Sequence, residues 1–206
     1  MGLEQYRRTV SETKRASILK AGRENFLKNG FSRAAVADIA READVSTATL
    51  YKHFSSKDEL FAAVVHDAYG NIGGEFPDFA DYNDIDIREM FLKMAHNYLR
   101  VQFDQGGNAL LRIVIAEVPT TPKIALDTYE TIVRRRFAGL KVVFDHLIER
   151  KLMRPHDTEM GVSFISGMIK EAFIWPALFD ADAKLPENTD VIIHEAIDLY
   201  LARYGV

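Results

Sequence analysis

Residues 32–61, SRAAVADIAREADVSTATLYKHFSSKDELF, constrain the fold more than any other part of the chain. Their apolar positions recur at helical spacing on both sides of a break at Asp44. Aspartate is one of the few residues other than glycine that tolerate the positive φ of a tight turn. The spacing predicts two short helices joined by that turn, with Ser46 or Thr47 capping the second helix. This is the geometry that puts a helix into the DNA major groove.

The second helix of this motif would present small polar and basic side chains, which suit base edges and phosphates. Ser56 and Glu59 then form a capping-box sequence that starts another helix. Lys57 lies at the N-terminus of that helix, where anions are favoured, and we expect it to hold a phosphate. The candidate DNA-contacting residues are Ser46, Thr47, Ala48, Thr49, Tyr51, Lys52, His53 and Lys57.

In these residues the chain resembles the TetR family of one-component transcriptional regulators. The strong motif covers roughly the first quarter of the chain. The sequence departs from the family's pattern at Ala35, Ala37 and Asp44. These departures affect the direct DNA contacts expected from the first helix of the motif. In the family, Tyr51 and His53 also pack the motif. The resemblance is carried by Ile39-Ala40, Val45-Ser46, Thr49-Leu50-Tyr51-Lys52-His53-Phe54, Lys57 and the apolar run from Leu60.

Charge is distributed unevenly along the chain. The formal net charge is −4, but residues 1–57 carry 11 Lys/Arg and 6 Asp/Glu, a balance of +5. Residues 58–206 carry 15 Lys/Arg and 24 Asp/Glu, a balance of −9. This asymmetry indicates that the first part meets phosphates while the remainder stays away from them.

The N-terminal residues offer two interpretations. We expect the first helix to open at Ser11 or Thr13 and to end at Gly30, a suitable residue for a positive φ. The basic residues that precede or open this helix would form either a flexible arm that reaches DNA or a plain disordered terminus. They are Arg7, Arg8, Lys14 and Arg15.

Composition excludes several protein classes. The absence of cysteine excludes disulfides and thiolate metal sites, and no two of the six histidines lie three or four residues apart. We therefore expect no metal and no cofactor. No stretch approaches the roughly 20 apolar residues of a membrane span, and the N-terminus lacks the apolar core of a signal peptide. We expect a cytoplasmic protein without membrane contact.

Helical periodicity continues after the motif and predicts an all-α fold of about nine helices. Residues 1–70 would form an N-terminal three-helix helix-turn-helix domain with a linking helix, and residues 71–206 a C-terminal helical domain. The boundary falls in the glycine-rich, acidic connector 70–84. Residues 109–118 could form a buried strand, but the resemblance favours a short helix. Pro176 is expected to kink or end a late helix.

Arg134-Arg135-Arg136 interrupts the apolar pattern of a long predicted helix. We interpret this cluster as a solvated face, with salt bridging to another helix as the alternative.

The resemblance implies that the C-terminal domain binds a small molecule and dimerises. An aromatic, apolar lining points to a hydrophobic or aromatic effector, with Glu117, His96 and Glu171 as candidate polar anchors. The candidate lining residues are Phe91, Met94, Tyr98, Phe103, Ile113, Tyr129, Phe137, Phe164, Met168 and Trp175. The last two helices would form a four-helix contact with a second copy. The candidate interface residues are Phe164, Ile165, Met168, Ile193, Ile197 and Tyr200.

The implied function is that of a homodimeric regulator, of the repressor type, that binds a palindromic double-stranded DNA operator and is released by its effector. A small helical enzyme is one alternative, but the sequence has no Gly-x-Ser-x-Gly turn, phosphate loop or His-Glu-x-x-His motif. A helical adaptor that keeps the motif only as a packing unit is another. The basic bias of residues 1–57 argues against the adaptor.

Overall fold

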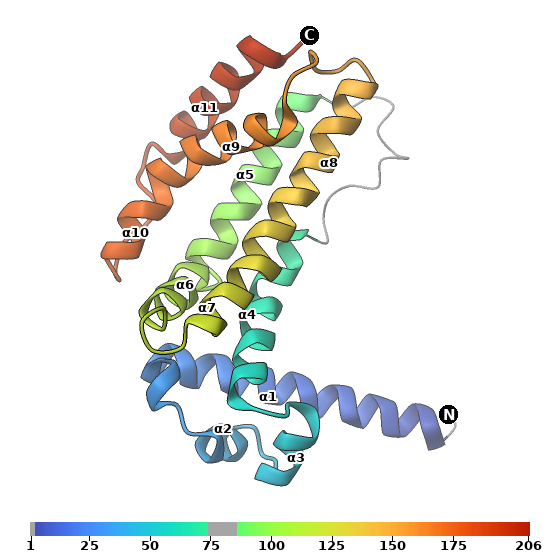
Figure 1. The fold of residues 1–206 in the computed structure, drawn as a ribbon, viewed down its shortest axis with the longest axis vertical. Helices are drawn as coiled ribbons and strands as arrows, with labels where there is room; N and C mark the ends of the chain where they lie inside the picture. The colour runs from blue at the N-terminus through green and yellow to red at the C-terminus, as the bar shows by residue number, and fades with distance from the viewer. Residues whose placement is uncertain (1–2, 74–85) are drawn as a thin grey trace. The chain divides into compact units, whose positions relative to one another are not determined.

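The structure, a computed structural model, describes residues 3–73 and 86–206. Over these residues the chain forms nine continuous helical runs and, apart from one isolated bridge between Met153 and Gly205, no β-pairing (Figure 1). The prediction of an all-α fold is confirmed. Residues 109–118 lie largely in helix α6 (Gly107–Ala116), so the helical alternative for this segment is also confirmed.

The described residues pack as two compact units. Unit 1 combines Met1–Ala68 with Ala109–Tyr129, and unit 2 combines Tyr69–Asn108 with Glu130–Val206. Most of the connector in which we placed the domain boundary lies outside the described residues. The boundary near residue 70 stays a prediction, and the packing adds residues 109–129 to unit 1.

Unit 1 is built from helices α1 (Leu3–Arg33), α2 (Val36–Glu42), α3 (Thr47–His53) and most of α4 (Lys57–Gly73). Its core contains three phenylalanine rings: Phe61 lies 5.0 Å from Phe26 and 5.1 Å from Phe31, between ring centroids. Gly30 breaks α1 with φ 73° and ψ 173°, a conformation open to glycine, and this turn brings Phe31 back onto Phe61. The expected positive φ at Gly30 is confirmed.

Helix α1 starts earlier than the sequence suggested. It begins at Leu3 and not at Ser11 or Thr13, so the N-terminal basic residues stand on a helix and form neither a flexible arm nor a disordered terminus. No glycine or proline interrupts residues 3–21, and Arg8 pairs with Glu12 one turn later at 2.9 Å. Both features favour the longer helix.

Unit 2 is a bundle in which α9 (Thr158–Ile169) packs against α8 (Arg135–Glu149) and α11 (Thr189–Tyr204). Helix α5 (Ile87–Phe103) packs against α11, and Asp86 caps it by accepting from two backbone N–H groups. The core is again aromatic: Phe144 lies 5.3 Å from Phe91 and 5.8 Å from Tyr200.

Two helical runs contain a π-helical turn. The turn η2 (Tyr129–Arg134) joins α7 (Pro122–Thr128) to α8, and η3 (Lys170–Ile174) joins α9 to α10 (Trp175–Phe179). Pro176 was expected to kink or end its helix, yet the helix continues to Phe179. Proline has no N–H to donate, and the wider turn immediately before it accommodates the missing bond.

One helix, Thr158–Phe179, is long and apolar enough by length and composition to cross a membrane, with a mean hydropathy of 1.3. The sequence prediction that no stretch approaches such a span was therefore too strict. Helices in protein cores pass the same test, and α9 packs against α8 and α11 within unit 2. Some large apolar side chains of this run, Phe164 and Trp175 among them, are exposed.

Candidate functional site

The helix-turn-helix of unit 1 forms as the sequence predicted. Asp44 holds the turn at φ 54°, and the Val45 N–H donates to the Ala40 carbonyl at 3.0 Å. Ser46 caps α3, because its Oγ accepts from the Thr49 N–H at 3.1 Å. Ala35, which precedes α2, provides no such side-chain bond. The motif is therefore held by its turn and by the cap of its second helix.

Helix α3 presents a row of side chains to solvent. Thr47, Ala48 and Lys52 are exposed, and Tyr51 retains 48% of its accessible surface. Leu50 on the opposite side is completely buried. Thr49 is only half-buried, and its hydroxyl lies 2.8 Å from the Ser46 Oγ, so part of its hydrogen-bonding capacity serves the cap. The free face of α3 therefore consists of small, aromatic and basic groups.

Cations from α1 gather near the end of α3. The Arg15 guanidinium lies 5.1 Å from the centroid of the Phe54 ring. Burial lowers the pKa of His53, and the neighbouring charges of Lys52, Arg15 and Lys14 lower it further. The sequence had assigned Lys14 and Arg15 to an arm or a loose terminus. The structure shows that they extend the positive surface beside α3.

Lys57 has a structural role that the sequence did not reveal. Its ammonium donates to the carbonyls of Phe31, Ser32 and Ala34 at 3.0, 3.3 and 3.3 Å, and lies 4.5 Å from the centroid of the Phe31 ring. A lysine has three N–H donors, and all three are engaged here. The ammonium therefore closes the end of α1, in place of the expected phosphate contact.

The capping box at the start of α4 differs from its expected form in one bond. The Glu59 N–H donates to Ser56 Oγ at 3.1 Å, as predicted. The Glu59 carboxylate instead accepts from the backbone N–H and hydroxyl of Ser55, at 2.7 and 2.6 Å. These two bonds lower the pKa of Glu59. The carboxylate thus fixes the loop between α3 and α4.

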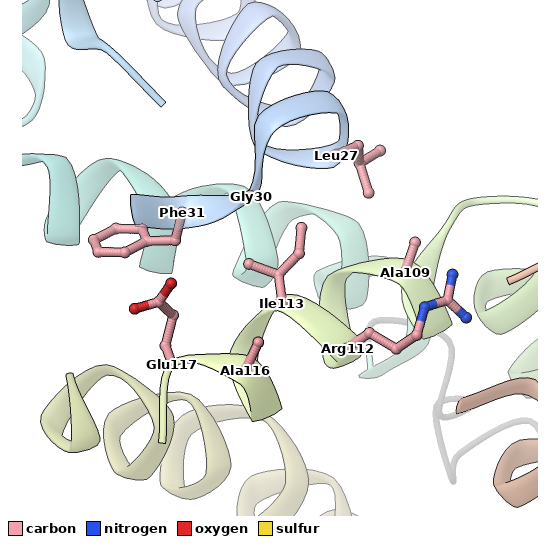
Figure 2. Close-up of a pocket in the computed structure, with 8 residues that line it drawn as sticks. All are labelled: Leu27, Gly30, Phe31, Ala109, Arg112, Ile113, Ala116 and Glu117. Atoms are coloured by element: carbon pink, nitrogen blue, oxygen red, sulfur yellow. The ribbon is translucent and has the colours of Figure 1, made fainter. Parts of the chain in front are cut away.

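A hollow of about 260 Å³ lies in unit 1 between α1 and α6 (Figure 2). Ile113 points from α6 toward Gly30, and it is the residue of the predicted ligand set that lines this space. The lining residues are Leu27, Gly30, Phe31, Ala109, Arg112, Ile113, Ala116 and Glu117. The hollow therefore draws on the end of α1 and on the segment that joins unit 1 from later in the chain.

Glu117 holds this later segment in place. Its carboxylate accepts from Ser32 Oγ at 2.8 Å, from Thr120 Oγ1 at 2.7 Å and from Thr121 Oγ1 at 3.3 Å. Burial alone would raise the pKa of Glu117, but the hydrogen bonds together lower it. The sequence proposed Glu117 as a ligand anchor. In the structure its carboxylate is occupied by protein donors.

The other two proposed polar anchors lie elsewhere. His96 is hydrogen-bonded to Asp190 at 2.9 Å and to the Leu92 carbonyl at 2.8 Å, while Glu171 is exposed. Among the described residues, no group of three or more His, Asp or Glu side chains is arranged to hold a metal.

The predicted ligand-lining residues do not come together as one set. Ile113 and Tyr129 belong to unit 1, and the other eight belong to unit 2. Phe91 is part of the aromatic core, whereas Trp175 is 53% exposed and stacks on Phe179. Tyr98 lies under the Arg136 guanidinium, which is 4.7 Å from its ring centroid. The remaining residues, Met94, Phe103, Phe137 and Met168, are half-buried, and Phe164 is half-exposed.

Four of the predicted dimer residues lie inside unit 2. Ile165, Ile193, Ile197 and Tyr200 retain at most 8% of their surface, so they offer little area to a second copy. The sequence could not separate the two sides of these helices, because both are apolar. The exposed large apolar residues of α9, α10 and α11 are Met160, Phe164, Trp175, Phe179, Val191 and Leu199.

Comparison with known proteins matches both parts of the chain. The family model "Bacterial regulatory proteins, tetR family" matches residues 18–64, and "AefR-like transcriptional repressor, C-terminal domain" matches residues 89–206. The chain is 29% identical to the HTH-type transcriptional regulator UidR of Escherichia coli over 123 residues, which are 57% of this chain and 58% of UidR. It is 41% identical to TtgR of Pseudomonas putida over 61 residues, 29% of each protein. These matches cover at most 58% of the length of these curated relatives.

Solved structures share the fold over nearly the whole chain. A TetR-family transcriptional regulator from Mesorhizobium loti has a TM-score of 0.83 at 24% identity, over 95% of this chain and 98% of that chain. The flavonoid-responsive regulator FrrA has a TM-score of 0.71 at 21% identity, over 93% and 97%. At such identities the likeness concerns the fold alone. The family matches put the protein in a class of regulators and not of enzymes. The chain belongs to the TetR family of DNA-binding transcriptional regulators.

Proposed function

We propose that this protein is a homodimeric repressor that binds a palindromic operator through α3 and leaves it when a small effector binds unit 2. The observation that carries the proposal is the free face of α3, flanked by the cations of α1. A short, capped helix with small polar and basic side chains on its outer side suits the major groove. Two-fold symmetry of the protein would require two symmetric half-sites.

The contacts on α3 divide by chemistry. We assign Thr47 and Ala48 to base edges or thymine methyl groups, Tyr51 and His53 to phosphates, and Lys52 to either. Ser46 and Thr49 serve mainly to cap the helix, since their hydroxyls bond to each other. Lys57 is left out of the contact set because its ammonium is bound to three carbonyls. Arg15 and Lys14 enter it, for they stand beside His53.

The exposed apolar face of the run from α9 to α10 supports a dimer. Phe164 is 50% exposed, Trp175 53% and Phe179 86%, and rings so exposed on one helical run indicate a covered surface. A side chain added at Gly167, on the same run, would meet open space. A small residue there lets the corresponding helix of a second copy approach closely. We therefore keep Phe164, replace the four buried members of the predicted dimer set by this outer face, and add Val191 and Leu199 of α11.

Repression and effector release rest on the relatives. The C-terminal family model is described as a repressor domain, and FrrA is described as flavonoid-responsive. By analogy we propose that unit 2 binds a small effector with a hydrophobic or aromatic body. Binding of effector and operator would then be linked, each weakening the other by the same factor. Such a protein would act in the cytoplasm, where its DNA is.

The proposal is tested by selection from random double-stranded DNA with the purified protein, with the mass of the complex measured by light scattering. We expect an enriched palindrome bound by two copies of the chain. No enrichment at low salt, or enrichment of a site without two-fold symmetry, would contradict the proposal.

The dimer surface is tested separately with Gly167→Glu, which puts a charge at the centre of the exposed face. We expect a folded monomer by circular dichroism and light scattering, with affinity for the palindrome lost because the two half-sites are no longer bound together. Ala138→Glu, at an exposed position on α8, is the matched control and should stay dimeric. If Gly167→Glu also stays dimeric, the dimer uses another face.

A further inference from the structure

Unit 2 contains two cations to which the proposed function assigns no role. Arg136 is the second residue of α8, and Lys170 is the first residue of η3. Both side chains are half-buried, and within residues 3–73 and 86–206 neither forms an ion pair with an Asp or Glu. Cations elsewhere on these helices do pair, as Lys141 does with Asp145 at 2.7 Å. Arg136 and Lys170 are therefore half-buried cations of unit 2 without a counter-charge among the described residues.

The surroundings of Arg136 are polar. Its guanidinium lies over the Tyr98 ring of α5. One turn further along α5, Gln102 is buried and accepts from the Tyr69 hydroxyl at 3.3 Å, while the same hydroxyl lies 2.8 Å from the Gly107 carbonyl. Burial raises the pKa of Tyr98 to about 12, so this phenol stays neutral and can donate a hydrogen bond. None of these neighbours brings a negative charge to Arg136.

The two cations also affect each other. Burial lowers the pKa of Arg136. Burial and then the nearby charge of Arg136 lower the pKa of Lys170. Two positive groups that are partly desolvated and repel each other are unfavourable unless a negative charge lies near them. The arrangement thus costs stability in the free protein, and a bound anion would offset that cost.

Both cations adjoin a π-helical turn. The turn η2 ends at Arg134, two residues before Arg136, and η3 begins with Lys170 itself. Turns of this kind are rare and occur frequently at functional sites, because they redirect side chains that a regular helix would send elsewhere. They are independent of the charge argument, and each lies next to one of the two cations in the chain.

We propose that unit 2 binds an organic anion whose carboxylate contacts the Arg136 guanidinium beside the Tyr98 ring. The planar guanidinium can hold a carboxylate through two parallel hydrogen bonds, and the Lys170 ammonium supplies a second positive charge. The inference rests on the proposed effector site and narrows its ligand from any hydrophobic molecule to one with an acidic head and an apolar body.

The proposal is tested by calorimetry on the full-length protein with three pairs of probes: benzoate, octanoate and 4-phenylbutyrate, each beside its neutral primary amide. We expect at least one acid to bind about tenfold or more tightly than its amide, in line with charge-assisted hydrogen bonds. Arg136→Gln should abolish this preference. Arg135→Gln, the exposed neighbour, is the matched control and should keep it. If no acid outbinds its amide, the proposal is wrong.

A second measurement needs no ligand. Lys170→Met should raise the thermal midpoint of the free protein, since it removes a buried, repelled charge while keeping the bulk of the side chain. A lowered midpoint would mean that Lys170 has a stabilising partner, and would overturn the proposal. Neither measurement involves DNA. Failure to select a palindrome would therefore count against the proposed function while leaving the anion site to be decided on its own.

Discussion

The two units of this protein distribute cationic and apolar side chains differently. Unit 1 has a phenylalanine core, exposes Lys52 of α3 and the cations of the N-terminal half of α1, and binds its half-buried Lys57 to three backbone carbonyls. Unit 2 keeps two cations partly inside and exposes Phe164, Trp175 and Phe179. We propose that this difference reflects what each unit binds: unit 1 a charged polymer at its surface, and unit 2 an apolar partner outside and a small anion within.

The energetic cost of the two arrangements differs as well. Cations at a surface stay hydrated and cost little, and their attraction to DNA falls as salt rises. Cations inside a fold lose hydration, which is unfavourable unless they find a counter-charge. Surface charge is therefore common and by itself indicates little about function, whereas a buried cation without a counter-charge indicates that a ligand supplies one. The following experiments test this contrast, beginning with the largest effect.

Phe61→Ala should remove the central ring of the unit 1 core. Phe61 is fully buried and contacts two other rings, so we expect a loss of about 3–5 kcal/mol in the free energy of unfolding of unit 1. Tyr51→Ala, on the exposed face of α3, should change it by less than about 0.5 kcal/mol. Urea unfolding followed by circular dichroism measures both. Similar costs for the two variants would mean that unit 1 has no such division between core and surface.

Lys57→Met should reveal a structural cation within unit 1. We expect it to lower the free energy of unfolding by about 1–3 kcal/mol, because three carbonyls lose a charged donor. The slope of log affinity against log salt should stay as in the parent. A flatter slope with unchanged stability would instead support the original prediction that Lys57 holds a phosphate.

Lys52→Ala should have the opposite pattern of effects on stability and on DNA binding. We expect unchanged stability, weaker binding to all DNA, and a salt slope smaller in magnitude by about one if Lys52 neutralises a phosphate. If Lys52 reads a base, the loss should instead depend on one operator position. Lys184→Ala, an exposed lysine of unit 2, serves as the control and should leave binding as it is. Equal effects from both lysines would show that only net charge matters.

His53 should give the smallest effect, a dependence of DNA affinity on pH. Its pKa is lowered in the free protein, so the ring is neutral at pH 7, and a phosphate beside it would raise the pKa again. DNA binding therefore takes up a proton, and affinity should rise as the pH falls from about 8 to about 6. His53→Gln should remove this rise at constant ionic strength. If the rise persists in His53→Gln, another group carries it.

Local features of unit 1 could be predicted from the sequence because their determinants lie close together. The turn residue Asp44 and the cap Ser46 are two positions apart, and each has its own conformational signature. The attachment of residues 109–129 could not be predicted in this way. It depends on a bond between Ser32 and Glu117, which are 85 residues apart, and no local pattern records that contact.

The faces of the unit 2 helices were harder to assign. Helix α11 carries Ile193 and Ile197 on one side and Val191 and Leu199 on the other, so its pattern gives no direction to the core. Four of the six predicted dimer residues therefore lie on the buried side. Only the folded unit shows which of these apolar residues face solvent and which face the core.

Arg136 was missed although the sequence contained a signal for it. It precedes Leu140 by four residues and Val143 by seven, which puts it on the apolar stripe of its helix. Reading Arg134-Arg135-Arg136 as one solvated cluster hid this difference. Arg134 and Arg135 are exposed, as expected, but Arg136 is half-buried on Tyr98.

The central claim is that α3 reads the operator in a symmetric pair. The most direct measurement is to repeat the random-DNA selection with Thr47→Ala and compare its base preferences with those of the parent. We expect an altered preference at one position in each half-site, related by the two-fold axis, with the rest of the palindrome retained. An unchanged preference at every position, or a change in one half-site alone, would contradict the account.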